Sequence, residues 1–259
     1  MVNDIRKEVS RNLKVRLKKF AAYNCFGALP VNCDAVDYLC FFDKIGLCYN
    51  RVQKNANTTV VSILCELNGL DFSSHIAAKK WCDQPPVSSL IRARDLHTCV
   101  VIRSPYSRLL SAFLQKFTFR RDTYVPRYGD FAPTPKGFSA FIGYLQRNGI
   151  DGNSHWDLQK KQIAYPLHCF DTVIRFEQFS KDMRDMLARL DIAPDMERLS
   201  GLGPTDIGKK TSADDNFYAF YGQEMLAAVR EMYKEDFAFL NYDPDLPVME
   251  SPLRNSPRS

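Results

Sequence analysis

The chain has 259 residues, of which 45% are hydrophobic and 25% are charged, and it carries a net charge of +5. This length fits a single α/β domain with insertions, and the apolar fraction is high enough to build a substantial core. No segment approaches the length of a transmembrane span, and eight cysteines without a Cys-x-x-Cys pair, together with only four histidines, argue against a structural metal site.

The N-terminal segment has the pattern of an amphipathic helix. Its apolar residues recur at helical spacing with charged residues between them: Ile5, Val9, Leu13, Leu17 and Phe20. We expect this helix and the loop after it, residues 1–45, to pack on the main domain; peripheral contact with a membrane surface, or with a partner, is the alternative. The segment lacks the uninterrupted apolar core of a signal peptide.

The cysteines divide into two groups. Cys48, Cys65 and Cys99 lie inside apolar runs, so we expect them to be buried, reduced thiols. An even count of cysteines also permits disulfides in a secreted protein. That alternative stays open for three cysteines near the N-terminus: Cys25, Cys33 and Cys40.

Strands and helices are predicted to alternate along the main domain, residues 46–242. Apolar runs predict strands at 46–52, 98–103 and 170–176. Helical periodicity predicts five helices, at 58–68, 105–120, 137–147, 180–190 and 217–239. Residues 122–136, rich in Pro, Tyr and Arg, are expected to form a surface loop, and residues 243–259 a flexible tail. This alternation predicts an α/β fold with a central parallel sheet flanked by helices.

The first predicted strand leads into a polar motif at the start of a helix, Gln53-Lys54-Asn55-Ala56-Asn57-Thr58-Thr59, which we call the first motif. Unpaired N–H groups and the helix dipole favour an anion at such a place, and Lys54 adds a full charge. The motif lacks the glycines of a Walker A loop. Taken alone, it could also be an ordinary strand-to-helix connection with a threonine cap.

The second predicted strand ends in a comparable place, Arg103-Ser104-Pro105-Tyr106-Ser107-Arg108-Leu109-Leu110-Ser111, which we call the second motif. Proline is well tolerated in a first helical turn. Arg103 would then lie at the mouth of the helix, with Ser111 about two turns further along on the same face. Two phosphate-binding places in one chain predict a ligand with two separated phosphates.

Together the motifs resemble those of the PAPS-dependent carbohydrate sulfotransferases of the chondroitin and HNK-1 type and their bacterial relatives, sulfotransferase family 2. The first motif resembles their 5′-phosphosulfate loop and the second their 3′-phosphate motif. Three further segments match in order: 153–159, which contains His155-Trp156 and is called the His-Trp segment below, the strand at 170–177, and the closing helix at 233–237. The resemblance covers Gly46 to Tyr242. Gln53 stands where a proline is usual, and Ser104 where an acidic residue is usual.

The resemblance implies a P-loop-like sulfotransferase fold and an enzyme that moves a sulfonate from PAPS to a carbohydrate hydroxyl, releasing PAP. Lys54 would stabilise charge on the leaving oxygen. The implied cofactor contacts are Gln53, Lys54, Asn55, Ala56, Asn57, Thr58 and Thr59 from the first motif, Arg103 and Ser111 from the second, and Lys210 and Thr211 from a later polar loop that also contains Lys209.

The acceptor hydroxyl needs a general base, and histidine suits the pH range. His75, between the two motifs, and His155 are the candidates, with Glu66, placed one turn along the first phosphate helix, as a further one. His97 and His168 are expected to be structural. The implied acceptor contacts are His155, Trp156 and Arg121. Trp156 could equally belong to the core, and Arg121 could serve only to keep the protein soluble.

Two rival functions remain open. One is a catalytically inactive module that binds polyanions or glycans on the same fold, and the other is a nucleotide kinase-like P-loop enzyme, which would need a Walker-type loop and an acidic metal-binding partner. The expected partner is a carbohydrate acceptor, anionic or lipid-linked, and no nucleic acid, although net charge alone does not separate these. The family's animal members are anchored in the Golgi; without such an anchor a cytoplasmic, bacterial-type enzyme is expected, and the Golgi lumen only if an anchor is missing from the chain.

Overall fold

The computed structural model of the protein describes residues 32–70, 95–193, 213 and 216–245. The helix predicted within residues 1–45, Cys25, and most of the tail predicted at 243–259 lie outside the described residues. Over the ranges that are described, no helix is both long and apolar enough to cross a membrane.

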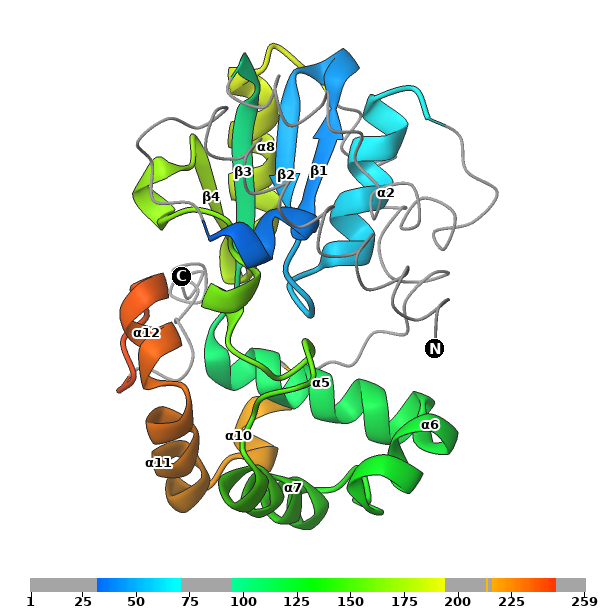
Figure 1. Ribbon diagram of the computed structural model, residues 1–259, viewed down its shortest axis with the longest axis vertical. Helices are drawn as coiled ribbons and strands as arrows, with labels where there is room; N and C mark the ends of the chain where they lie inside the picture. Colours follow the sequence, from blue (N-terminus) through cyan, green and yellow to red (C-terminus); the bar gives the residue numbers. More distant parts are fainter. Residues whose placement is uncertain (1–31, 71–94, 194–212, 214–215, 246–259) are drawn as a thin grey trace, which may run out of the picture.

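Three parallel strands form the centre of the fold (Figure 1). They are β2 (Leu47–Asn50), β3 (His97–Ile102) and β4 (Thr172–Arg175), side by side in that order, and each lies within a residue or two of its predicted position. The register pairs Ile102 with Arg175. Since the strands are parallel, their carboxyl ends meet at one edge of the sheet, where open α/β sheets bind ligands.

A fourth strand, β1 (Leu39–Phe42), pairs with β2 and runs antiparallel to it. The predicted central parallel sheet is confirmed in β2, β3 and β4, and the antiparallel edge strand β1, which precedes residue 46, makes the whole sheet mixed. The chain reverses over η2 (Asp43–Ile45) and Gly46, whose φ of 63° lies in the left-handed region that glycine adopts without steric penalty.

Side chains of the strands alternate between the two faces of the sheet, so each face contributes to a core of its own. One face packs against α2 (Asn57–Leu67) and α8 (Phe179–Arg189) through Leu47, Tyr49, Cys99, Val101 and Ile174. The other face packs towards α5 (Pro105–Phe119) through Cys48, Val100 and Ile102. Cys48 and Cys99 are buried thiols outside any disulfide, as predicted.

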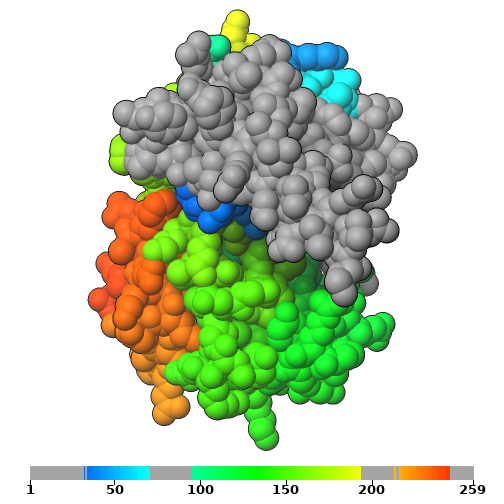
Figure 2. Space-filling view, viewed as in Figure 1, coloured from blue at the N-terminus to red at the C-terminus, as the bar shows by residue number. Residues whose placement is uncertain are grey.

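The helix α5 extends from the sheet into a second, helical half of the molecule (Figure 1). There it packs against α7 (Pro135–Asn148) and α11 (Gln223–Met232). Aromatic rings fill the contact: Phe113 on α5 lies 5.0 Å, centroid to centroid, from Phe138 on α7. In the space-filling view the C-terminal helices, in orange, lie against residues from the middle of the sequence (Figure 2).

The single helix predicted at 217–239 is wrong: three helices occupy this region, α10 (Phe217–Phe220), α11 and α12 (Lys234–Leu240). Tyr221 and Gly222 between the first two have extended backbone, with ψ of 120° and 170°. The break buries Tyr221, whose ring stacks on Phe217 at 4.5 Å and whose hydroxyl donates to the carbonyl of Tyr106 at 2.8 Å. Tertiary burial thus overrides local periodicity.

The surface loop predicted at 122–136 is also wrong in its first half, where α6 (Arg121–Tyr128) forms despite Pro126 inside it. Tyr124 and Tyr128, one turn apart, stack on each other at 5.7 Å and pack edge-on to Trp156. This shared aromatic contact stabilises a helix in which proline removes one hydrogen bond.

Short 3-10 turns connect the remaining elements. They are η1 (Cys33–Tyr38), η4 (Gln159–Gln162), η5 (Leu167–Cys169) and η6 (Phe176–Gln178). The His-Trp segment runs directly into η4, so that this turn follows the segment at the edge of the sheet where the strands end.

Two glycines of α7 provide a test of how closely this helix packs against the residues before it. A Cβ added at Gly137 would lie 1.9 Å from the carbonyl oxygen of Ala132, whereas at Gly143 it would meet only the end of the Arg147 side chain at 3.4 Å. We expect Gly137→Ala to lower the free energy of unfolding by about 1–3 kcal/mol. Gly143→Ala, the matched control, should be neutral or stabilising by up to about 1 kcal/mol. Equal denaturant midpoints for the two variants would contradict the placement of Gly137.

Candidate active site

The connection between β2 and α2, residues 53–56, turns through two left-handed residues and is called the Lys54 loop below. Lys54 has φ of 72° and Ala56 has φ of 53°. Such conformations cost non-glycine residues about 1–3 kcal/mol each and persist only where the surroundings enforce them. Buried Asn55 between them supplies that enforcement, since its amide nitrogen donates to the carbonyl of Val101 at 2.8 Å and to Gln159 at 2.7 Å.

The N-terminus of α2 has no side-chain cap. Its N-cap residue is Ala56, not a threonine, so the alternative of an ordinary threonine-capped connection is not what forms. An uncapped helix start has first-turn N–H groups available to a bound anion. Thr58 and Thr59 lie half-buried in this turn, and the side-chain oxygen of Asn57 is buried with no hydrogen-bond partner among the described residues.

The second motif contacts the Lys54 loop directly. Arg103, which is buried, donates from Nη1 to the carbonyl of Lys54 at 3.2 Å and from Nε to the hydroxyl of Ser107 at 2.9 Å. Its guanidinium also stacks on the ring of Phe176, 3.8 Å from the centroid. Pro105 occupies the first turn of α5, as predicted, and buried Ser111 lies further along the same helix. The structure therefore brings the two predicted motifs together.

Arg108 is a residue of this site for which the sequence predicted no role. It is 1% exposed, and its guanidinium donates to three carbonyl oxygens: Gln53 at 2.9 Å, Asp157 at 2.8 Å and Ser154 at 2.9 Å. It thus joins the Lys54 loop to the His-Trp segment. A signal existed in the sequence, because Arg108 is a charge directly before the apolar pair Leu109 and Leu110 on the helix predicted at 105–120.

Lys54 lies in a concentration of positive charge. Its Nζ donates to Gln115 of α5 at 3.1 Å. Burial, followed by Arg103, Lys116 and Arg108, holds the pKa of Lys54 well below its ordinary value. Every charge that shifts this pKa is positive. A bound anion would counter that repulsion, so the arrangement suits a phosphate or sulfonate.

His155 has a defined tautomer. The side-chain oxygen of Asn153 accepts from the backbone N–H of His155 at 3.1 Å, which identifies that atom as the oxygen. The same oxygen lies 2.9 Å from Nδ1 of His155, so Nδ1 must carry the hydrogen. In the neutral imidazole Nε2 then has the lone pair, which is the form a general base requires. The ring is half-buried and edge-on to Tyr124.

Two predicted acceptor contacts have structural partners here. Trp156 is 1% exposed and packs among Tyr124, Tyr128 and Phe141, so a sugar could reach its indole only if those rings moved. Arg121 donates to the carbonyl of Phe117, pairs with Asp130 and holds the corner between α5 and α6. The contacts of Trp156 and Arg121 with an acceptor stay predictions.

The other predicted residues fall outside the site or outside the described residues. His97 bonds to Thr172 at 2.8 Å, each being the first residue of its strand, at the sheet edge opposite the site. His168 is exposed on η5. Glu66 is not one turn along α2 but about 13 Å from its start. His75, Lys209, Lys210 and Thr211 lie outside the described residues.

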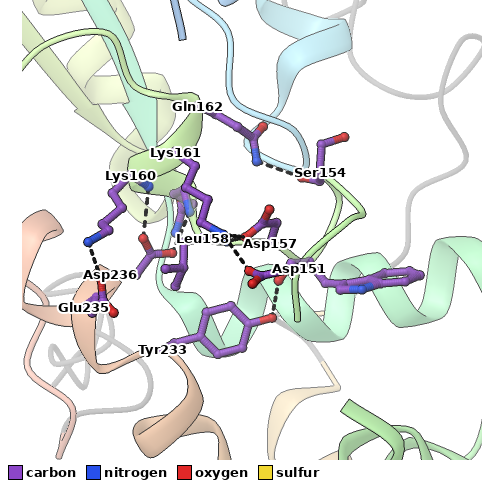
Figure 3. A network of polar contacts seen from close by, with 12 residues as sticks. Asp151, Ser154, Asp157, Leu158, Lys160, Lys161, Gln162, Tyr233, Glu235 and Asp236 are labelled. Carbon is purple, nitrogen blue, oxygen red and sulfur yellow. Dashed lines mark hydrogen bonds and ion pairs between the residues drawn. The ribbon is translucent and has the colours of Figure 1, made fainter. Parts of the chain in front are cut away.

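A polar network links the site to the C-terminal helix (Figure 3). Asp236 of α12, fully buried, accepts from the backbone N–H groups of Gln159 at 2.7 Å and Lys160 at 3.0 Å. Burial raises the pKa of this carboxyl, and the nearby Arg108 opposes the rise. Gln162 accepts from the N–H of Gln53 at 2.9 Å and donates to the carbonyl of Ser154 at 2.8 Å. Gln159 and Gln162 were not predicted as parts of this site from the sequence.

A model of the sulfotransferase family (Sulfotransfer_2) matches residues 37–243, well over half of the chain. The chain belongs to this family. The match confirms the resemblance predicted from the motifs, and the fold agrees with it: a central sheet flanked by helices. Comparison with curated proteins and with solved structures found no significant match. In the parts of this sulfotransferase that are described, no cluster of three potential metal ligands occurs.

The charge around Lys54 leads to a stability prediction. Because its folded-state pKa is lowered, the unfolded chain binds more protons between the lowered and the ordinary pKa, and charged Lys54 destabilises the ligand-free fold. Lys54→Met should therefore raise the melting temperature near pH 7 by about 2–4 °C, equivalent to about 1 kcal/mol. The gain should shrink as pH rises toward the ordinary pKa of lysine.

Lys136→Met is the control for this experiment. Lys136 is exposed on α7, away from the Lys54 loop, so its replacement should change stability by less than about 0.5 kcal/mol. A lower melting temperature for Lys54→Met, compared with Lys136→Met, would show that Lys54 supports the ligand-free fold and is not held there against repulsion.

Proposed function

We propose that this sulfotransferase moves a sulfonate from PAPS to a hydroxyl of a carbohydrate acceptor and releases PAP. The observation that carries the proposal is the direct contact between the two motifs, in which Arg103 donates to the carbonyl of Lys54 beside the N-terminus of α2. A ligand with a phosphate at each motif would span a short distance, as a nucleoside with 5′ and 3′ phosphate groups does.

The donor set suits such a cofactor. It combines two cationic side chains, Lys54 and Arg103, with a helix start that has no side-chain cap and with hydroxyls at Thr58 and Ser111. Charged donors form the strongest hydrogen bonds to phosphate oxygens, and arginine contacts them in a forked geometry. The lowered pKa of Lys54 fits a place prepared for negative charge.

Each residue then has a distinct task. PAPS, when bound, supplies an activated sulfonate with PAP as the leaving group. The first-turn N–H groups of α2, with Thr58 and Thr59, hold the 5′-phosphate, and Arg103 and Ser111 hold the 3′-phosphate. Lys54 stabilises the charge that develops on the leaving oxygen, and the neighbouring cations Arg103, Lys116 and Arg108 add to the positive potential there. Lys210 and Thr211 are proposed to add cofactor contacts.

For the acceptor we propose His155 as the general base, because its Nε2 carries the lone pair while Asn153 holds Nδ1. The base removes the proton from the acceptor hydroxyl as sulfur–oxygen bond formation begins. The His-Trp segment is tied to the Lys54 loop through Arg108, which links the position of His155 to that of the cofactor. His75 is the rival base.

The acceptor and the location of the enzyme are proposed more broadly. Exposed arginines at the start and end of α6, Arg120 and Arg127, would suit an anionic or lipid-linked carbohydrate. A cytoplasmic location stays a prediction that cell fractionation would test.

The first experiment is a thermal shift with PAP and with ATP, both without magnesium. PAP at about 100 times its dissociation constant should stabilise the protein by roughly 2.7 kcal/mol, and ATP should have a smaller effect because it lacks the 3′-phosphate. Arg103→Met should abolish the difference between the two ligands, whereas Arg189→Met, at the exposed end of α8, should preserve it. Equal responses to both ligands would favour the kinase-like alternative. Binding that depends steeply on salt, without turnover, would favour the polyanion-binding alternative.

The base assignment is tested by replacing histidines one at a time. His155→Ala should lower kcat by about 10²–10⁴-fold while leaving the dissociation constant of PAP unchanged, since the residue acts on the acceptor. His168→Ala, an exposed control on η5, should retain full activity. If His75→Ala removes activity and His155→Ala does not, the base is His75 and the proposed role of His155 is wrong.

A further inference from the structure

Gln159 is the residue at which the two motifs meet. Its side chain is 0% exposed. The side-chain oxygen accepts from the backbone N–H of Arg103 at 3.2 Å, and the side-chain nitrogen donates to the carbonyl of Arg103 at 2.8 Å. This two-point pairing requires one donor and one acceptor on the same group. The carboxamide of glutamine supplies both, whereas an ionised carboxylate only accepts and a methionine side chain does not donate, so the contact depends on the chemistry of glutamine and not merely on its volume.

The same oxygen of Gln159 also holds the first motif. It accepts from the side-chain nitrogen of Asn55 at 2.7 Å, and Asn55 lies between the two left-handed residues of the Lys54 loop. Asn55 additionally donates to the carbonyl of Val101 near the end of β3. One buried amide is therefore bonded both to the loop that would hold the 5′-phosphate and to the backbone of the residue that would hold the 3′-phosphate.

Gln159 is itself held from outside the motifs. Its backbone N–H, with that of Lys160, donates to Asp236 on α12, and this carboxylate fixes the start of η4 (Figure 3). The amide of Gln159 is thus anchored by a helix that is distant in sequence from both motifs. A side chain anchored in this way can act as a rigid spacer between them.

We infer that Gln159 is a positioning residue that sets the spacing between the two phosphate-binding motifs, and so determines how much the 3′-phosphate adds to cofactor affinity. The inference rests on the proposed function. A ligand with two phosphates gains from the second contact only when the two places are held at the distance that separates its phosphates. A ligand with one phosphate at the 5′ position does not depend on that spacing.

The test compares the dissociation constants of PAP and 5′-AMP by calorimetry. Gln159→Glu is nearly isosteric, but an ionised glutamate replaces the donor to the carbonyl of Arg103 with an acceptor. The ratio of the two constants, AMP over PAP, should fall by about tenfold or more relative to the wild type. Gln159→Met, which is uncharged and of similar size, should lower the ratio as well and serves if the glutamate variant does not fold.

Gln162→Glu is the matched control. Gln162 is buried in the same 3-10 turn, but its side-chain amide bonds to the N–H of Gln53 in the first motif and to the carbonyl of Ser154 in the His-Trp segment, and to neither group of Arg103. The Gln162→Glu substitution introduces the same charge nearby. It should weaken the binding of PAP and of 5′-AMP to a similar extent, so that the ratio of their dissociation constants stays within about twofold of the wild type. A role of Gln159 in stability alone would lower the melting temperature without changing the ratio.

The outcomes separate the inference from the proposed function. If the wild-type protein binds PAP no more tightly than 5′-AMP, the proposed use of a 3′-phosphate fails. If the wild type prefers PAP strongly and both folded Gln159 variants keep that preference, the proposed function stands and the positioning role of Gln159 is overturned. If Gln162→Glu lowers the ratio as much as Gln159→Glu does, the spacing does not depend on Gln159 specifically, and the inference is likewise overturned.

Discussion

The Lys54 loop has to change direction between a strand and a helix, and in doing so it leaves backbone polar groups that neither element satisfies. Buried carbonyl and N–H groups need partners. Arg108 donates to the carbonyl of Gln53, Arg103 to that of Lys54, and Gln162 accepts from the N–H of Gln53. With these groups bound on the protein side, the loop keeps its left-handed residues in place and the start of α2 in position to receive an anion.

Satisfying carbonyl oxygens with arginines has an electrostatic consequence. Burial lowers the pKa of Lys54, and the positive charges of Arg103, Lys116 and Arg108 next to it lower that pKa further. The same contacts that stabilise the loop therefore disfavour the charged form of Lys54 in the absence of a ligand. This exchange of stability for binding is common where a site is organised for charge that arrives later.

The His-Trp segment and α12 complete the site from a distance. The hydroxyl of Tyr233 bonds to the carbonyl of Trp156, and Asp236 bonds to the start of η4, so the last helices hold the segment that contains His155 (Figure 3). Arg108 fixes the other side of this segment through the carbonyls of Ser154 and Asp157. Segments that the family resemblance joined only by order in the sequence form one hydrogen-bonded unit in space.

The sequence alone determined the family, the three parallel strands and the two motifs at their ends, because each of these depends on residues that are neighbours in the chain. The tertiary structure decided the rest: the antiparallel β1, the break between α10 and α11 that buries Tyr221, the helix α6, and the burial of Trp156. It also decided the roles of Arg108 and Gln159. Their partners lie 46 to 77 residues away for the key bonds to Ser154, Arg103 and Asp236, and no local pattern can specify hydrogen bonds over such separations.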